Sequence, residues 1–300
     1  MAPDAVQTPY HQGSRSVQDK LGVRDLADHV GRSMAQGLRP VAAAFLEIQP
    51  MLVLGAADAT GAVHASLLTG DPGFVRATGP RQISVAGASP ATDPLAAALA
   101  REGTPVGTLA LDPRTRRRMR LNGRSRPTPR GLAIEADQVF SNCPKYLQKR
   151  ELYEGRRPEV PGGPRRGARL TEGQRAFVAA ADTFFVATVH AHGADASHRG
   201  GNPGFVRVLS PYALEWDDFP GNSMFLTLGN LAADPRAGLL FLDWTTGTTL
   251  QLTGTARTTY AKDGTRTLRF SVAEAIETPS ASPWRWSDPE FSPANPRPGG

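Results

Sequence analysis

Short apolar stretches, separated by glycine, proline and small polar residues, run through most of this chain of 300 residues. The run MLVLGAA at 51–57, the turn Asp-Ala-Thr-Gly and the apolar stretch at 62–68 together predict a β-hairpin. Two longer hairpins are expected within 106–126 and 237–260. Single strands are expected at 73–77, 81–87, 131–142, 183–189, 196–201, 204–209, 213–219 and 266–278. The pattern predicts a mainly β fold with a few helices.

Helices are expected where an apolar period of three to four follows a capping residue. These segments are 41–49, 93–103, 143–152, 171–182 and 221–235. Asp93 followed by Pro94 is a typical helix start, and Thr171 is positioned to cap the fourth segment. The apolar period of residues 17–38 is irregular, so we expect the N-terminal segment to pack loosely.

A repeat links the two halves of the chain. PGFVR occurs at 72–76 and again at 203–207, so the numbering offset between the copies is 203 − 72 = 131. The same offset aligns Ser66 with Ser197 and Gly123 with Gly254, and no gap is needed from about residue 62 to 126. In-register matches on both sides of a pentapeptide predict a duplicated β-barrel unit, and hence an intrachain pseudo-dimer.

The repeat implies a division of the chain into five parts. They are an N-terminal lead-in (1–40), a first unit (41–153), a linker rich in glycine, proline and arginine (154–169), a second unit (170–278) and a C-terminal tail (279–300).

Composition narrows the setting. The net charge of +6 fits an anionic partner or, as we prefer, an arginine-rich solvated surface. No apolar run approaches the roughly 18 residues of a membrane span, and the N-terminus does not resemble a secretory signal. A single cysteine, Cys143, excludes an intrachain disulfide and fits the reducing cytoplasm. No Cys/His cluster has metal-ligand spacing, and His190 and His192 are expected to be exposed, so no metal is expected.

The two copies differ where chemistry is expected. The second copy carries Ser197, His198, Arg199, Gly200 and Gly201, whereas the aligned residues of the first copy are Ser66, Leu67, Leu68, Thr69 and Gly70. Arginine binds phosphate with two hydrogen bonds, and glycine lets backbone N–H groups approach an anion. Strand alternation predicts that Ser197 and Arg199 face one ligand and that His198 faces the other side. An exposed strand with an ordinary ion-paired arginine is the alternative.

Three further groups are candidates for binding. Asn222 and Ser223 precede an expected helix whose free N–H groups suit an anion, and Asn230 lies within that helix. The uncharged donors Thr248, Thr249 and Gln251 follow a tight turn and suit a heterocycle. A plain helix cap and a solvated strand face are the alternatives. No catalytic triad, P-loop or Rossmann fingerprint occurs, so no catalytic residue is nominated.

The arginines between Arg114 and Arg130 offer a different function. Alternation places Arg116, Arg118 and Arg120 on one face of a strand, which suits a phosphate, an acidic partner or nucleic acid. Aromatic residues that would stack on bases are not interleaved with them, which disfavours nucleic acid.

The second half resembles the flavin-nucleotide-binding proteins related to pyridoxamine 5′-phosphate oxidase. The resemblance lies in the order strand, ASHRGGNPGFVRV, strand, GN-helix-DP, AGLLFLDW and TTLQLTG. NCPKYLQKR at 142–150 and RRRMRLNGR at 116–124 resemble a two-copy subgroup of that family. The resemblance implies two tandem FMN-binding split β-barrel units. It implies that Ser197, Arg199, Asn222 and Ser223 hold the FMN phosphate, and that the strand with Thr248, Thr249 and Gln251 contacts the flavin ring.

The resemblance also implies an activity. It points to an FMN-dependent oxidoreductase acting on a small-molecule substrate, with an electron donor such as NAD(P)H; a non-catalytic flavin carrier is the alternative. The family's helix-start Ser-Arg-Lys is replaced by Asn222-Ser223-Met224, which argues against vitamin B6 oxidation. The sequence leaves open whether two chains pair as a homodimer.

Overall fold

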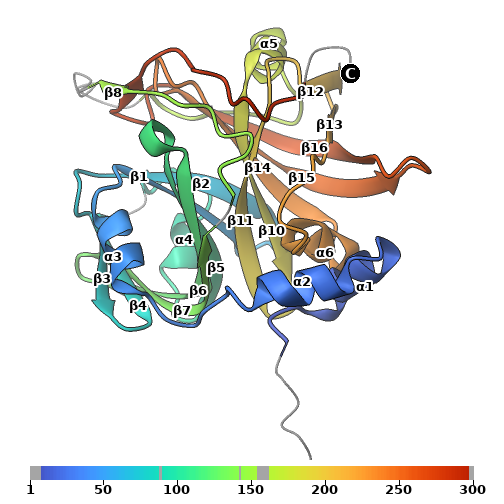
Figure 1. The fold of residues 1–300 in the computed structure, drawn as a ribbon. Coiled ribbons are helices and arrows are strands. Elements are labelled where there is room, and N and C mark those ends of the chain that lie inside the picture. The colour runs from blue at the N-terminus through green and yellow to red at the C-terminus, as the bar shows by residue number, and fades with distance from the viewer. Residues whose placement is uncertain (1–7, 88–89, 142, 154–161, 297–300) are drawn as a thin grey trace, which may run out of the picture.

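The computed structural model describes residues 8–87, 90–141, 143–153 and 162–296 and shows a mainly β protein. Two large antiparallel sheets lie side by side, and short helices pack around them (Figure 1). Among the described residues, no helix is long and apolar enough to cross a membrane.

The first sheet has the strand order β2-β1-β5-β6-β7-β4-β3. Its strands are β1 (Met51–Ala57), β2 (Val63–Thr69), β3 (Val75–Gly79), β4 (Gln82–Ala86), β5 (Thr104–Asp112), β6 (Arg117–Thr128) and β7 (Gly131–Ser141). The expected hairpins and strands of this half are therefore confirmed.

The second sheet has the order β11-β10-β14-β15-β16-β13-β12. Its strands are β10 (Thr183–His190), β11 (Gly193–Gly200), β12 (Val206–Ser210), β13 (Ala213–Asp217), β14 (Arg236–Leu242), β15 (Thr249–Tyr260) and β16 (Arg266–Thr278). The strand β9 (Arg165–Gly167) adds to β16, so part of the expected linker joins this sheet. A separate pair consists of β8 (Leu152–Tyr153) and β17 (Arg285–Trp286), which lies in the expected tail.

The two sheets repeat one topology. Each strand of the first sheet has a counterpart at the same place in the second, and the PGFVR offset also relates the bounds of β3 to those of β12 and the bounds of β4 to those of β13. Within the described residues neither sheet closes into a barrel. The strand order is thus common to both halves, whereas closed split-barrel units are not seen.

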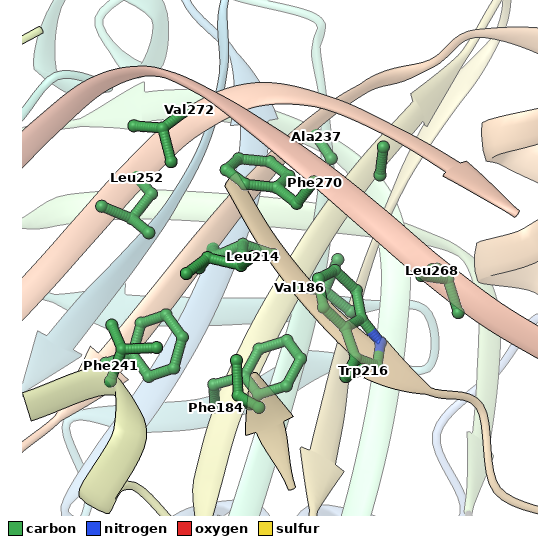
Figure 2. Packing of buried hydrophobic residues seen from close by; sticks show 14 of the residues in the cluster. Phe184, Val186, Leu214, Trp216, Ala237, Phe241, Leu252, Leu268, Phe270 and Val272 are labelled. Atoms are coloured by element: carbon green, nitrogen blue, oxygen red, sulfur yellow. The ribbon is translucent and has the colours of Figure 1, made fainter. Parts of the chain in front are cut away.

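The strands β1 and β10 are buried on both faces, which explains their mostly apolar sequences. In β10, Phe184 and Val186 point into the core of the second half, where Figure 2 shows them together with Leu214, Trp216 and Phe241. Phe185 and Ala187 alternate with them and pack in a cluster that both halves share. The strand β1 divides its residues in the same way. A strand with a core on each side cannot alternate apolar with polar residues.

The contact between the halves is reciprocal. Arg120 of β6 donates to the Ser197 hydroxyl of β11, and Gln251 of β15 donates to the Ser66 hydroxyl of β2 over 3.0 Å. The repeat offset relates Arg120 to Gln251, just as it relates Ser66 to Ser197. Each half therefore places its long hairpin against the second strand of the other half, as the subunits of a two-fold dimer do.

Two glycines permit this contact. A Cβ atom at Gly107 would overlap the Cα of Asp195, and one at Gly238 would lie 2.6 Å from the Cα of His64. The same repeat offset relates these two pairs. Because the neighbouring atoms belong to backbone, no rotamer change could make room for a side chain.

The helices agree less well with the sequence prediction. They are α1 (Gln12–Lys20), α2 (Arg24–Gly31), α3 (Pro40–Glu47), α4 (Ala96–Leu99), α5 (Glu172–Ala180) and α6 (Leu226–Ala233), with a 3₁₀ turn at Pro113–Thr115. The expected helices at 41–49 and 171–182 are confirmed, and Thr171 forms a capping box with Gln174. The helix expected at 93–103 is only the short α4. The chain turns into β5 soon after it, where Thr104 donates to the Ala98 carbonyl.

The helix expected at 143–152 is wrong. Tyr146 has a φ of 64°, which breaks a right-handed helix. The carbonyl of Cys143 accepts from Arg118 and that of Leu147 accepts from Arg116. This segment therefore satisfies its backbone through first-half arginines rather than through helical hydrogen bonds.

The N-terminal segment packs closely, contrary to expectation. The helix α1 lies against α6, and α2 packs beside α1 (both blue in Figure 1). Val17 is 3% exposed and joins the core of the second half, and Gln18 is fully buried and donates to the Met224 carbonyl. Close approach of Gly13 to the backbone of Gly229 brings α1 and α6 together. Residues 12–31 are therefore part of the folded body.

A stacked pair of histidines joins the N-terminal segment to β10, and it makes the stability of the fold depend on pH. The rings of His11 and His190 stack with centroids 4.4 Å apart, so His190 is half-buried rather than exposed as expected. Burial, followed by the charges of His11 and His192, lowers the pKa of His190 to about 4. The unfolded chain binds this proton near pH 6.5, so stability is complete above that pH and declines as the pH falls toward about 4.

We therefore expect the urea-derived free energy of unfolding to fall between about pH 7 and about pH 4.5, and His190→Asn to reduce that slope. His29, an exposed histidine of α2, provides the matched control His29→Asn, which should keep the slope of the unmodified chain. An unchanged slope in His190→Asn would contradict the prediction.

Candidate functional site

A pocket with a cavity volume of about 100 Å³ lies where β11 of the second half meets β6 of the first. Its third wall is the segment 217–228, which leads into α6. The lining residues with polar side chains or glycine backbone are Arg118, Arg120, Cys143, Lys145, Tyr146, His198, Arg199, Gly200, Asp217, Asp218, Gly221, Asn222, Ser223 and Thr227. Both halves therefore contribute cationic groups to one site.

The structure brings most of the predicted β11 residues to this pocket. His198, Arg199 and Gly200 line it, whereas Ser197 is fully buried behind it and accepts hydrogen bonds from Arg120 and Arg199. The side chains of Ser197 and Arg199 lie on one face of β11, as strand alternation predicts, because Arg199 donates to the Ser197 hydroxyl over 2.7 Å. His198 also lines the pocket, and Ser197 supports the two guanidinium groups from behind.

Gly200 has a packing reason to be glycine. A Cβ atom there would overlap the carbonyl oxygen of Tyr146. The small residue thus admits the 143–147 segment of the first half to the pocket wall. Gly201 does not line the pocket, and a Cβ atom there would meet the ring of Phe205.

Arg118 is the unusual charge of the site. It donates to His198 Nδ1 over 2.6 Å and to the Cys143 carbonyl over 2.8 Å, and no carboxylate of a described residue forms an ion pair with it. Its Nε atom is shielded from solvent and has no partner among the described residues. Burial, followed by the charges of Arg120 and Arg199, lowers its pKa to about 9. A shielded cation without a counter-charge favours an anionic ligand.

The other two guanidinium groups have partial compensation. Arg120 pairs with Asp195 at 3.1 Å, and Arg199 pairs with Asp218 at 3.3 Å. Asp218 also pairs with Arg266 at 3.1 Å, so its charge is shared between two cations. Within the part of the chain that the structure describes, the buried Nε atoms of Arg120 and Arg199 have no partner. Positive charge therefore exceeds negative charge around the pocket.

His198 adds a directed hydrogen-bond donor. A guanidinium can only donate, so His198 Nδ1 accepts from Arg118 and the neutral ring carries its proton on Nε2. Burial, followed by the charges of Arg118 and Arg199, holds the pKa of His198 well below its usual value, so the ring is neutral at pH 7. His198 Nε2 is buried and no described residue bonds to it. It can donate to a ligand.

Asn222 and Ser223 line the pocket, although they do not begin a helix. The helix α6 starts only at Leu226, and Asn222 Oδ1 accepts from the Met224 backbone in the loop before it. Ser223 and Phe225 both have left-handed backbones, with φ of 59° and 55°. Non-glycine residues in this conformation are strained and concentrate at functional sites. The first turn of α6 also lines the pocket and contributes free N–H groups.

Four other predicted residues lie elsewhere. Thr248 bonds to Thr246, Thr249 pairs with Leu242, and Gln251 reaches Ser66 of the first half, so none of them lines the pocket. The reason is the reciprocal contact, which places β15 against β2 instead of β11. Asn230 is buried in α6 and bonds to Thr188 and His11, outside the pocket.

First-half residues that the sequence indicated as a possible phosphate contact, but did not assign to this site, take the place of these. Arg118 and Arg120 occupy the positions in β6 that Thr249 and Gln251 occupy in β15. The internal repeat together with a two-fold contact is the signal that could have found them. Lys145 and Tyr146 reach the pocket from the segment that was expected to be helical.

The expected arginine face is not formed. Arg116 has a φ of 52° and lies before β6, and it bonds to the Leu147 carbonyl and to Glu290. Arg120 is 8% exposed and faces the second half. These arginines therefore hold segments of the protein together or line the pocket, rather than presenting one surface to nucleic acid.

Comparison with known proteins points to one family for the second half. Residues 170–282 match the family model of pyridoxamine 5′-phosphate oxidase. The match includes β11 and α6, so it covers the second-half walls of the pocket. Among curated proteins, none matches the chain.

Solved structures give weak similarity. A candidate pyridoxamine 5′-phosphate oxidase from Lactobacillus delbrueckii is 18% identical and covers 36% of this chain and 94% of its own, with a TM-score of 0.31. An FAD-binding protein from Mesorhizobium loti is 10% identical and covers 38% of this chain and 97% of its own, with a TM-score of 0.29. A Clostridium acetobutylicum protein of the pyridoxinephosphate oxidase family is 12% identical and covers 38% and 89%, with a TM-score of 0.28.

Proposed function

We propose that this protein binds FMN and that its phosphate occupies the pocket between β11 and β6. The observation that carries the proposal is Arg118, a half-buried guanidinium without a carboxylate partner in the described structure, beside the unpaired His198 Nε2–H. Phosphate offers several acceptor oxygens and a negative charge, which match these donors and those of Arg199. The family match of residues 170–282 supports a flavin nucleotide as the source of this phosphate.

The pocket is smaller than a whole flavin site. Its volume of about 100 Å³ compares with roughly 300–1,000 Å³ for typical small-molecule sites. It suits the phosphate end, and we infer that the segment 219–225 moves to admit the ribityl chain and the ring. Tyr146 and Phe219, whose ring centroids lie 5.2 Å apart, are aromatic residues at the pocket that would contact the ring.

We propose further that the two sheets are tandem split-barrel copies and that one flavin binds per chain. The common strand order and the reciprocal contact support the duplication. At the related place in the other copy, Thr249 and Gln251 replace Arg118 and Arg120, and Leu67 and Leu68 replace His198 and Arg199. That place lacks the cations, so we expect no second phosphate site.

The proposed activity is that of a flavin-dependent oxidoreductase. Bound FMN would supply the redox chemistry by accepting and passing on a hydride. The protein would bind the phosphate through Arg118 and Arg199, orient the ring with Tyr146 and Phe219, and offer His198 Nε2–H as a hydrogen-bond donor. We propose NAD(P)H or a similar donor as the reductant and a small molecule as the oxidant. A flavin carrier without turnover is the alternative.

An FMN titration tests the binding. We expect a yellow complex with one FMN per chain, and Arg199→Ala should weaken binding by about 1.5–3 kcal/mol because a charged hydrogen bond is lost. Isothermal calorimetry gives both the affinity and the stoichiometry. A colourless protein that takes up no added FMN, or an unchanged affinity in Arg199→Ala, would refute the site.

Reduction of the bound flavin separates the enzyme from the carrier. For the enzyme, anaerobic NADPH or NADH should bleach the flavin absorbance, and a small-molecule oxidant should restore it over repeated cycles. A flavin that binds with the expected stoichiometry but resists reduction by these donors would favour the carrier.

A further inference from the structure

A second and larger cavity lies beneath the N-terminal helices, with a volume of about 780 Å³. Its walls come from the N-terminal segment, β6 and β7 of the first half, the β10–β11 turn and α6. Asp195 separates it from the phosphate pocket, because this carboxylate accepts from Arg120 on one side and from Asn122 on the other. The volume lies within the range of small-molecule sites.

An aromatic wall borders this cavity. His11 and His190 both line it, with their rings parallel to within 9°. His11 Nε2 donates to Asn230 Oδ1 over 2.7 Å, and His11 Nδ1 accepts from the Gly13 backbone over 3.1 Å. Both nitrogens of His11 are therefore used, which fixes a neutral ring in place as a stacking surface.

Unused hydrogen-bonding groups surround the same cavity. Asn122 is 7% exposed and lines the cavity, and its Oδ1 atom is buried with no partner in the described chain. The carboxylate of Asp137, also at the wall, makes no ion pair with any described residue. His190 Nδ1 accepts from the His192 backbone, so the neutral ring carries its proton on Nε2. The wall thus offers two acceptors and one donor.

We propose that this cavity binds a nucleoside-like compound, a flat nitrogen heterocycle with N–H donors and a neutral polar substituent. The heterocycle stacks on the histidine pair. Its N–H groups donate to Asn122 Oδ1 and to the Asp137 carboxylate, and one of its ring nitrogens accepts from His190 Nε2. The cavity exceeds the size of a heterocycle alone and leaves room for a sugar-sized group. The proposal is independent of flavin binding.

The charges at the cavity favour an uncharged ligand. Arg15 is paired with Asp28, and Arg32 bonds to His29 and is exposed, so solvent screens its charge. Asp195 is paired with Arg120. The carboxylate of Asp137 disfavours an anionic ring, because like charges would meet at the wall. Benzoate is therefore a suitable negative probe.

Ligand-observed NMR with adenosine tests the proposal on the full chain. We expect saturation transfer from the protein to adenosine, and shifts of the His11 and His190 ring signals. Ribose, which has no heterocycle, and benzoate, which has no N–H donor, should give neither. His190→Ala should weaken adenosine binding by about tenfold or more, while His29→Ala, outside the cavity on α2, should keep it.

Asp137→Ala covers the case in which His190→Ala does not fold, because Asp137 is exposed and its removal leaves the core intact. It should also weaken adenosine binding, by about threefold or more. Arg199→Ala, at the other pocket, should keep full adenosine affinity. The proposal is overturned if adenosine does not bind at about 10 mM, if benzoate binds equally well, or if the folded cavity variants bind adenosine as the unmodified chain does.

Discussion

Arg118→Met is expected to weaken FMN binding by about 1.5–3 kcal/mol while the ligand-free protein still folds. Most arginines that line a binding site also form an ion pair, so removing them damages the fold and the site together. Arg118 has no carboxylate partner in the described structure, and burial lowers its pKa to about 9. Its charge is therefore without a counter-charge in the free protein and gains one when an anion binds.

Methionine is the suitable replacement because it keeps an unbranched side chain of similar reach while removing the charge. Calorimetric titration with FMN measures the loss of affinity, and thermal unfolding without ligand measures the Tm. Arg76 is the matched control, since it is an exposed arginine outside the pocket that donates to the Gly73 carbonyl. Arg76→Met should keep the FMN affinity. A variant Arg118→Met with unchanged affinity and a lower Tm would make this arginine structural.

Gly107→Ala and Gly238→Ala are each expected to destabilise the protein by about 3 kcal/mol. The added methyl group would overlap the Asp195 Cα in the first variant and would lie 2.6 Å from the His64 Cα in the second. Both positions are far inside van der Waals contact, so the two halves must separate locally. Because the two contacts are related by the same internal offset, the two losses should be similar.

Urea unfolding of each variant measures the loss. Gly173 of α5 is the control glycine, because a Cβ atom there would meet nothing within 4 Å. Gly173→Ala should raise stability by about 0.4–1 kcal/mol, since alanine reduces the freedom of the unfolded chain. If Gly107→Ala and Gly238→Ala were as stable as the unmodified protein, the close approach of the two sheets would be disproved.

Much of the fold follows from local sequence. The runs at 51–57 and 183–189 are mostly apolar because each strand faces a core on both sides, and their sequences correctly predict strands. Turn residues mark the hairpin positions. The helix predicted at 143–152 is wrong because its propensity is local, whereas the carbonyls of Cys143 and Leu147 bond to distant arginines. Such partners lie outside any sequence window.

The candidate site shows the same limit. The difference between the copies predicts His198, Arg199 and Gly200, and these residues line the pocket. Thr249 and Gln251 belong to the same unit as these residues, so the sequence predicts them at the same site. The contact between the halves instead places them beside the first half. Which strand faces which is decided by packing between the halves, so the sequence of one half alone could not locate Arg118.

The reciprocal contact lies within one chain, so substitutions can alter one of the two related places without altering the other. In a dimer of identical chains, a substitution appears at both related positions, so a cation gained by one site is gained by the other. Here one polypeptide carries both positions, and Arg120 and Gln251 can differ freely. The linkage also keeps the two walls of the pocket together at any dilution. Protein concentration should therefore have no influence on ligand affinity.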